Sequence, residues 1–132
     1  MMDETQVQDE HPSLLLVDDD ETFCRVLKKA LTRRGFEVTV ANEVETALAL
    51  AESSPPEFAI VDLKMPGPSG LVLVKRLKEL DEETRIVMLT AFGREEVRRQ
   101  AERVPIDGFL VKPVSAVTLR ETIVRVFARE QS

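Results

Sequence analysis

Three carboxylates follow aliphatic runs that have the length and character of buried strands. Asp18 and Asp19 come directly after Leu14–Val17. Asp62 comes directly after Phe58–Val61. The first and third strands of a doubly wound sheet are neighbours, and ligands bind beyond their carboxyl ends, so these side chains should share one pocket. Ionised carboxylates would repel one another there unless a cation neutralised them. Mg²⁺ prefers such oxygen ligands, and the sequence therefore predicts a magnesium site.

Two more polar side chains follow the last two aliphatic runs of the chain. Thr90 comes after Ile86–Leu89, and Lys112 comes after Phe109–Val111. The lysine would add a positive charge on a flexible stem, and the threonine would add a hydroxyl donor. Beside a magnesium ion these groups suit phosphoryl chemistry, in which Asp62 acts as the nucleophile and becomes an acyl phosphate.

The elements that would position these residues alternate regularly along the chain. The expected strands are residues 14–17, 38–41, 58–61, 86–89 and 109–111. Apolar residues at helical spacing predict five helices, over residues 23–31, 44–51, 73–80, 97–104 and 119–127. Five alternating β-α units predict an α/β fold with a parallel sheet covered on both faces. The second strand leads into Asn42, for which the sequence indicates no role.

Composition is consistent with one domain preceded by a tail. The chain has 132 residues, of which 43% are hydrophobic, enough for one core. Residues 1–12 contain four acids and neither Lys nor Arg, and we expect them to form a disordered acidic tail. The domain is expected to cover residues 13–132.

Charge and apolar content argue against several classes of partner. The net charge is −6, but outside the tail 20 acids face 18 basic residues, so there is no basic field to bind nucleic acid directly. The apolar runs are much shorter than the ~20 residues that span a bilayer, so no membrane association is expected. A single cysteine, Cys24, fits a reducing compartment, and we expect a cytoplasmic protein.

Four motifs in this order resemble the receiver domain of two-component response regulators. They are Asp18-Asp19, the turn from Asp62 to Gly67 (DLKMPG), Thr90-Ala91 and Lys112-Pro113. The resemblance covers residues 13 to about 128. It implies a flavodoxin-like, doubly wound five-stranded parallel sheet of order 2-1-3-4-5 with five helices. It also implies a signalling phosphoprotein whose Asp62 accepts a phosphoryl group from a phosphohistidine of a sensor kinase or histidine phosphotransfer protein.

The resemblance also implies roles for individual site residues. Asp19, Asp62 and the backbone carbonyl of Lys64 would bind Mg²⁺ directly, and Asp18 would bind it through water. Lys112 and Thr90 would hold the phosphoryl group. Such a protein is not an enzyme in the usual sense, because it catalyses only its own magnesium-dependent phosphorylation and dephosphorylation.

The implied switch joins Thr90 to Phe109. Phosphorylation would draw the Thr90 hydroxyl inward and vacate space for the Phe109 ring. The surface formed by residues 97–104, 109–111 and 119–127 would then change and bind a downstream output protein. A homodimer could use the same surface.

Two features depart from the usual family pattern. Pro105 stiffens the turn before the fifth strand, where many relatives have a glycine-containing helix cap. No output domain follows the last helix in this sequence, which leaves either a single-domain regulator or an output domain outside the sequence.

Two other function classes compete with this reading. The first is a haloacid-dehalogenase-type phosphatase, whose first motif resembles the spacing of Asp18, Asp20 and Thr22. That family also needs an acidic pair after its lysine, and no Asp follows Lys112 in this sequence. Asp20 is better explained as a helix N-cap, with Glu21 as an acid of the first turn. The second alternative is a receiver that binds partners without phosphorylation. EF-hand and P-loop motifs are absent from the sequence.

Overall fold

The computed structural model describes residues 11–63, 70–90, 99 and 106–127. Its strands are β1 (Ser13–Val17), β2 (Glu37–Ala41), β3 (Phe58–Asp62), β4 (Arg85–Thr90) and β5 (Gly108–Val111). Its helices within these ranges are α2 (Glu21–Arg33), α3 (Val44–Ser53), α4 (Gly70–Leu80) and α6 (Ala116–Phe127). The helix expected over residues 97–104, together with Pro105, lies outside the described residues except for Arg99. Residues 1–10 of the expected tail also lie outside them, so the division of the chain at residue 12 stays a prediction.

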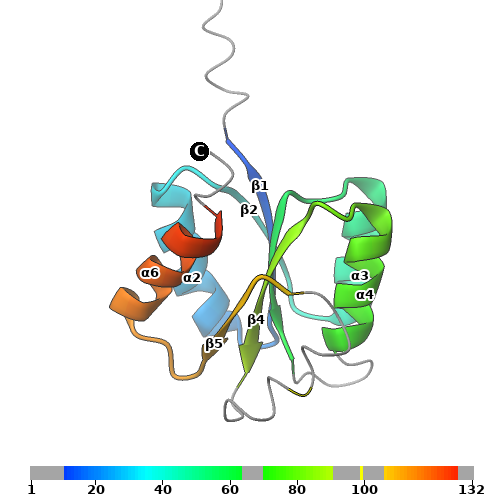
Figure 1. Cartoon of the computed structure of the whole chain (residues 1–132). Coiled ribbons are helices and arrows are strands. Elements are labelled where there is room, and N and C mark those ends of the chain that lie inside the picture. Colours follow the sequence, from blue (N-terminus) through cyan, green and yellow to red (C-terminus); the bar gives the residue numbers. More distant parts are fainter. Residues whose placement is uncertain (1–10, 64–69, 91–98, 100–105, 128–132) are drawn as a thin grey trace, which may run out of the picture.

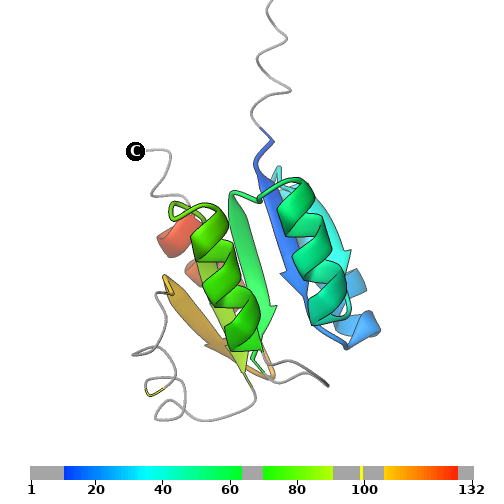
Figure 2. The ribbon, with the colours of Figure 1, turned by 90° about the vertical axis from the view of Figure 1, so that its right-hand side faces the viewer.

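All neighbouring strands are parallel, and their order is β2-β1-β3-β4-β5. This order confirms the doubly wound sheet that the resemblance implied. α2 and α6 cover one face of the sheet, and α3 and α4 cover the other (Figure 1). The quarter-turn view shows α3 and α4 side by side in front of the strands (Figure 2).

The continuous apolar runs follow from helices on both faces. Side chains alternate across a strand, so Leu14 and Leu16 enter the core beneath α2 and α6 while Leu15 and Val17 enter the core beneath α3 and α4. All five residues of β3 are buried. Burying one such aliphatic side chain contributes about 1.5–3 kcal/mol, so the central strands are aliphatic on both faces up to their carboxyl ends.

Local signals set the ends of α2. Asp20 is its N-cap, and a side-chain oxygen of Asp20 accepts a hydrogen bond from the backbone N–H of Phe23 at 3.0 Å. After the helix, Gly35 has φ +99°, a conformation that only glycine adopts at little cost. No helix within the described ranges is long and apolar enough to cross a bilayer.

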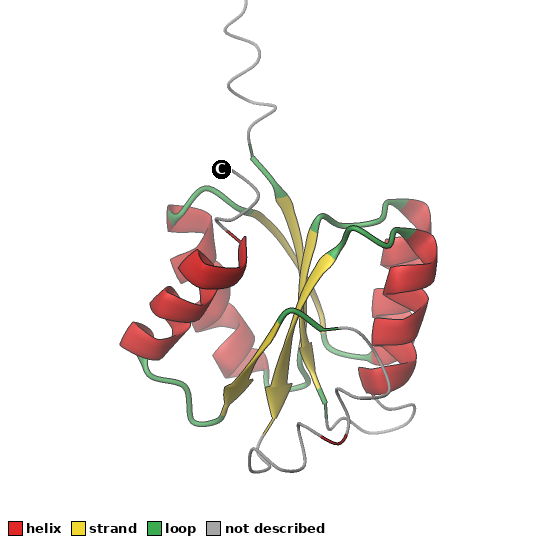
Figure 3. Cartoon of the chain, viewed as in Figure 1, coloured by secondary structure: helices red, strands yellow, loops and turns green. Residues whose placement is uncertain are grey.

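The parallel arrangement brings the carboxyl ends of the strands to one edge of the sheet. In Figure 3 this is the lower edge, where β4 and β5 end in arrowheads. Register pairs Val17 of β1 with Val61 of β3, so the residues that follow these two partners lie next to each other. This edge holds the candidate site.

Candidate functional site

Three acids converge at the carboxyl ends of β1 and β3. Asp18 and Asp19 follow β1, and Asp62 is the last residue of β3. One carboxylate oxygen from each lies within 4.8 Å of the others. Asp18 is fully buried and Asp62 is 5% exposed, whereas Asp19 is exposed. The pocket therefore combines two buried carboxylates with one that solvent can reach.

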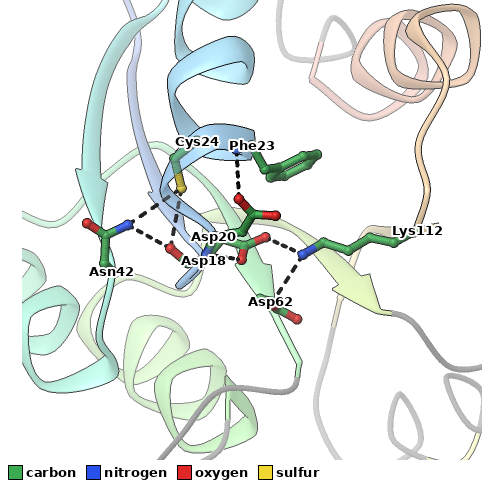
Figure 4. A network of polar contacts seen from close by, with 7 residues as sticks. All are labelled: Asp18, Asp20, Phe23, Cys24, Asn42, Asp62 and Lys112. Atoms are coloured by element: carbon green, nitrogen blue, oxygen red, sulfur yellow. Dashed lines mark hydrogen bonds and ion pairs between the residues drawn. The ribbon is translucent and has the colours of Figure 1, made fainter.

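Lys112 enters the same pocket from the end of β5. Its Nζ lies 2.6 Å from Oδ2 of Asp18 and 3.5 Å from Oδ2 of Asp62 (Figure 4). Burial alone would lower the pKa of Lys112, but its close contact with Asp18 and the charge of Asp62 outweigh that effect and raise the pKa. The ammonium therefore stays charged and neutralises part of the acidic cluster.

One oxygen of Asp18 is incompletely satisfied. Oδ2 of Asp18 is buried and has no hydrogen-bond partner of good geometry, although the Lys112 ammonium lies at ion-pair distance. The contact is an ion pair whose angle is poor for a hydrogen bond, and it still attracts strongly because charge attraction depends weakly on angle. Among the described residues, three carboxylates face one ammonium, which leaves an excess of negative charge there. Their hard oxygen atoms fit a divalent cation such as Mg²⁺.

Asn42 is a site residue to which sequence reasoning gave no role. Its side-chain amide donates a hydrogen bond to the backbone carbonyl of Asp18 at 2.8 Å, and the Cys24 thiol donates to the same oxygen at 3.3 Å (Figure 4). The backbone N–H of Asp18 donates to the carbonyl of Ala41 at 3.2 Å. The sequence partly indicated that Asn42 lies near Asp18, because Asn42 follows β2 and the order 2-1-3-4-5 puts β2 beside β1.

The Cys24 thiol is a donor and stays protonated. Burial, followed by the negative charges of Asp18 and Asp20, raises its pKa from the ordinary value of 9.0 to about 11. A thiol in such surroundings is a poor nucleophile. Cys24 therefore supports the Asp18 backbone and takes no part in thiolate chemistry.

Asp20 lies outside the acid cluster. Its backbone N–H donates to Oδ1 of Asp18 at 2.9 Å, and its own carboxylate caps α2. Both interactions hold the turn between β1 and α2 in place. This is the N-cap role expected from the sequence.

Gly70 allows α4 to begin directly behind Asp62. A Cβ built on Gly70 would overlap the carbonyl oxygen of Asp62 and lie 3.1 Å from Cγ1 of Val61. The N–H of Gly70 donates to the carbonyl of Leu63 at 3.3 Å. Any larger residue at this position would displace the end of β3.

The remaining expected site residues are placed only in part. Thr90 is the last residue of β4 and pairs with Val111, which puts its backbone at the same edge of the sheet; its side chain is not described. Phe109 lies in β5, half-buried against the core beneath α3 and α4. Lys64 lies outside the described residues.

A family comparison agrees with this geometry. The family model for the response regulator receiver domain matches residues 14–124, most of the chain. The chain belongs to the response regulator receiver domain family. Receiver domains belong to two-component signal transduction, and this family is distinct from the haloacid-dehalogenase-type phosphatases.

Individual receiver proteins are similar over most of this chain. It is 40% identical over 107 residues to the photosynthetic apparatus regulatory protein RegA of Rhodovulum sulfidophilum, covering 81% of this chain and 58% of that protein. The chemotaxis response regulator CheY4 of Vibrio cholerae has 31% identity and a TM-score of 0.82, covering 89% of this chain and 99% of that one.

A third relative was solved in a phosphorylated form. It is a response regulator from Burkholderia pseudomallei with a phosphorylated aspartic acid, a calcium ion and citrate. It has 31% identity and a TM-score of 0.76, and the match covers 92% of this chain and 73% of that one. The chain thus spans only part of some of its relatives, including little more than half of RegA.

Proposed function

We propose that Asp62 is the phosphoacceptor and takes a phosphoryl group from a phosphohistidine of a sensor kinase or histidine phosphotransfer protein. The observation that supports this most is the position of Asp62 at the end of β3, with two acids on one side and Lys112 Nζ 3.5 Å from its Oδ2. This arrangement puts a carboxylate nucleophile next to both a potential cation site and a fixed positive charge.

In the proposed transfer, a carboxylate oxygen of Asp62 attacks the phosphorus atom of the donor. An O–P bond forms, the P–N bond to the imidazole breaks, and the electron pair leaves with the donor histidine. Lys112 would pair with a phosphoryl oxygen, and the Thr90 hydroxyl would donate a hydrogen bond to another. Hydrolysis of the same acyl phosphate by water would return Asp62 to its free form.

Asp18, Asp19 and Asp62 would hold Mg²⁺, with Asp18 acting through water and the backbone carbonyl of Lys64 completing the set. The bound ion would offset negative charge on the transferred group. The buried Oδ2 of Asp18, which lacks a good hydrogen-bond partner, supports this assignment. The calcium ion and phosphorylated aspartic acid of the Burkholderia pseudomallei relative support it by analogy.

The proposed output is a change of surface on one side of the molecule. Thr90 ends β4, and Phe109 lies on the adjacent strand, so movement of the threonine toward a phosphoryl group would free room for the half-buried ring. The surface comprises β5, α6 and residues 97–104. It would bind a downstream output protein or domain, and a second copy of the chain could use it as well. A cytoplasmic location belongs to the same proposal.

The decisive experiment is phosphorylation by a small donor. The protein is incubated with Mg²⁺ and acetyl phosphate, and its intact mass is measured by mass spectrometry. The matched controls are the Asp62→Asn variant and the original protein with a metal chelator added. We expect one added phosphoryl mass that is absent from both controls. An unmodified protein, or a modified Asp62→Asn variant, would contradict the proposal and favour a receiver that binds partners without phosphorylation.

A further inference from the structure

The Phe23 ring contacts the charged end of Lys112. The Lys112 Nζ lies 4.8 Å from the centroid of the ring, within the range of a cation–π interaction. Phe23 is half-buried in the first turn of α2, and Lys112 follows β5, so the contact joins segments far apart in the sequence. Nothing in the sequence alone indicated it.

This contact completes a closed cycle of four interactions beside the site, which joins Lys112, Asp18, Asp20 and Phe23. Lys112 pairs with Oδ2 of Asp18, whose Oδ1 accepts from the N–H of Asp20. The Asp20 carboxylate accepts from the N–H of Phe23, whose ring in turn lies against Lys112. Figure 4 shows the four residues together. Because each member is held by two others, the position of the aromatic ring is coupled to that of the ammonium.

The ammonium is held closer to Asp18 than to Asp62. The two ion-pair distances are 2.6 Å and 3.5 Å. An ammonium bound tightly to Asp62 would withdraw electron density from the oxygen that has to attack phosphorus. The Phe23 ring attracts the ammonium without occupying any carboxylate oxygen. The ring therefore favours a position of the Lys112 ammonium beside the Asp62 carboxylate and not in direct contact with it.

We propose that Phe23 is a positioning residue for the phosphoacceptor reaction, acting through Lys112. The inference rests on the proposed function of Asp62 and adds a residue to it. Its role depends on the negative face of an aromatic ring, so another aromatic residue should replace it and an aliphatic one of similar size should not.

The test compares Phe23→Leu with Phe23→Tyr by two measurements. In the unmodified protein, ring current should shift the ε-methylene protons of Lys112 upfield in NMR spectra. The shift should be lost in Phe23→Leu and retained in Phe23→Tyr. With excess Mg²⁺ and acetyl phosphate, the rate constant for phosphorylation should fall about threefold in Phe23→Leu, the size expected for a partly exposed cation–π contact. Phe23→Tyr should keep the original rate.

Phe36→Leu is the matched control. Phe36 packs edge-on against Phe58 and Phe127 in the core beneath α2 and α6, at centroid distances of 5.5 and 5.7 Å. It makes no cation–π contact within the described residues, so its replacement should lower stability without moving the Lys112 resonance or the rate. Site-specific fluorination of Phe23 adds a graded test, because fluorine weakens the negative ring face with little change in size.

The outcomes separate this inference from the proposed function. The positioning role would be overturned if the Lys112 resonance were unshifted in the original protein. It would also be overturned if Phe23→Leu were phosphorylated as fast as the original protein, or if Phe36→Leu slowed phosphorylation as much as Phe23→Leu. Equal slowing of Phe23→Tyr and Phe23→Leu would overturn it too. A protein that takes up no phosphoryl group would overturn the proposed function, and the Lys112 resonance would then still decide whether the ring holds the ammonium.

Discussion

The side-chain amide of Asn42 donates a hydrogen bond to the backbone carbonyl of Asp18 at 2.8 Å. The contact joins the end of β2 to the end of β1, and it is shared with the thiol of Cys24. It fixes the backbone of a buried acid whose side chain faces Lys112 and Asp62. Part of the support for the acid cluster therefore comes from the end of β2, the strand at the side of the sheet, which contributes no acid to the cluster.

Replacing Asn42 should loosen the acid cluster without dismantling the fold. Asn42→Ala removes one of the two side-chain donors that the described residues offer to the Asp18 carbonyl. We expect a loss of about 1 kcal/mol in the free energy of unfolding. Mg²⁺ affinity should fall severalfold, measured by NMR titration. The exposed Thr39 of β2 serves as control, because Thr39→Ala should leave both quantities nearly unchanged. Equal Mg²⁺ affinity in Asn42→Ala would show that the amide has no influence on the cluster.

A methyl group at Gly70 should disturb Asp62 directly. Gly70→Ala places a Cβ against the Asp62 carbonyl oxygen, and such overpacking costs about 1–3 kcal/mol. We expect lower stability in urea unfolding together with weaker Mg²⁺ binding. Gly35→Ala is the matched control, since φ +99° strains alanine far from the site and should lower stability alone. Unchanged Mg²⁺ affinity in Gly70→Ala would rule out the coupling.

Removing the positive charge of Lys112 should make stability depend more strongly on Mg²⁺. Lys112→Gln leaves the buried carboxylates of Asp18 and Asp62 facing each other. Without divalent ions, we expect the free energy of unfolding to fall by about 2 kcal/mol. This is less than for a fully buried ion pair because the lysine is partly exposed. Millimolar Mg²⁺ should recover more stability in the variant than in the original protein. Asp62→Asn combined with Lys112→Gln should restore part of the loss, and an additive double mutant would contradict the pairing.

The ionisation of Cys24 should lower stability at alkaline pH. The folded pKa of about 11 exceeds the ordinary 9.0, so the folded state binds the proton more tightly than the unfolded state. The contribution of the thiol is complete below pH 9 and is lost as the pH rises toward 11. The difference in unfolding free energy between the original protein and Cys24→Ser should therefore shrink over this range.

Other groups that titrate in the same window do not obscure this comparison. The raised pKa of Lys112 is common to both proteins, and its effect cancels to first order in their difference. Serine keeps a donor near the Asp18 carbonyl without ionising in this range. A constant difference from pH 8 to 11 would mean that the thiol does not titrate as its burial indicates.

Local patterns were sufficient to predict a parallel α/β sheet and the acids at its strand ends, whereas the strand order came from the family resemblance. The runs LLLV, FAIV and IVML are each apolar throughout because helices cover both faces of the sheet, and such burial can be read from a few consecutive residues. The Asp20 cap is equally local, since its carboxylate bonds three residues along. The proximity of Asp18, Asp19 and Asp62 followed from the shared edge of parallel strands, without any knowledge of their exact register.

Only the tertiary structure decided which groups support those acids. Asn42 reaches Asp18 across 24 residues, and Phe23 meets Lys112 across a larger separation, so no local pattern encodes either contact. The closer approach of the Lys112 ammonium to Asp18 than to Asp62 also depends on side-chain packing between β1, β3 and β5. A sequence specifies which residues end each strand through short-range periodicity, whereas distances between strand ends depend on register, twist and packing of the whole sheet.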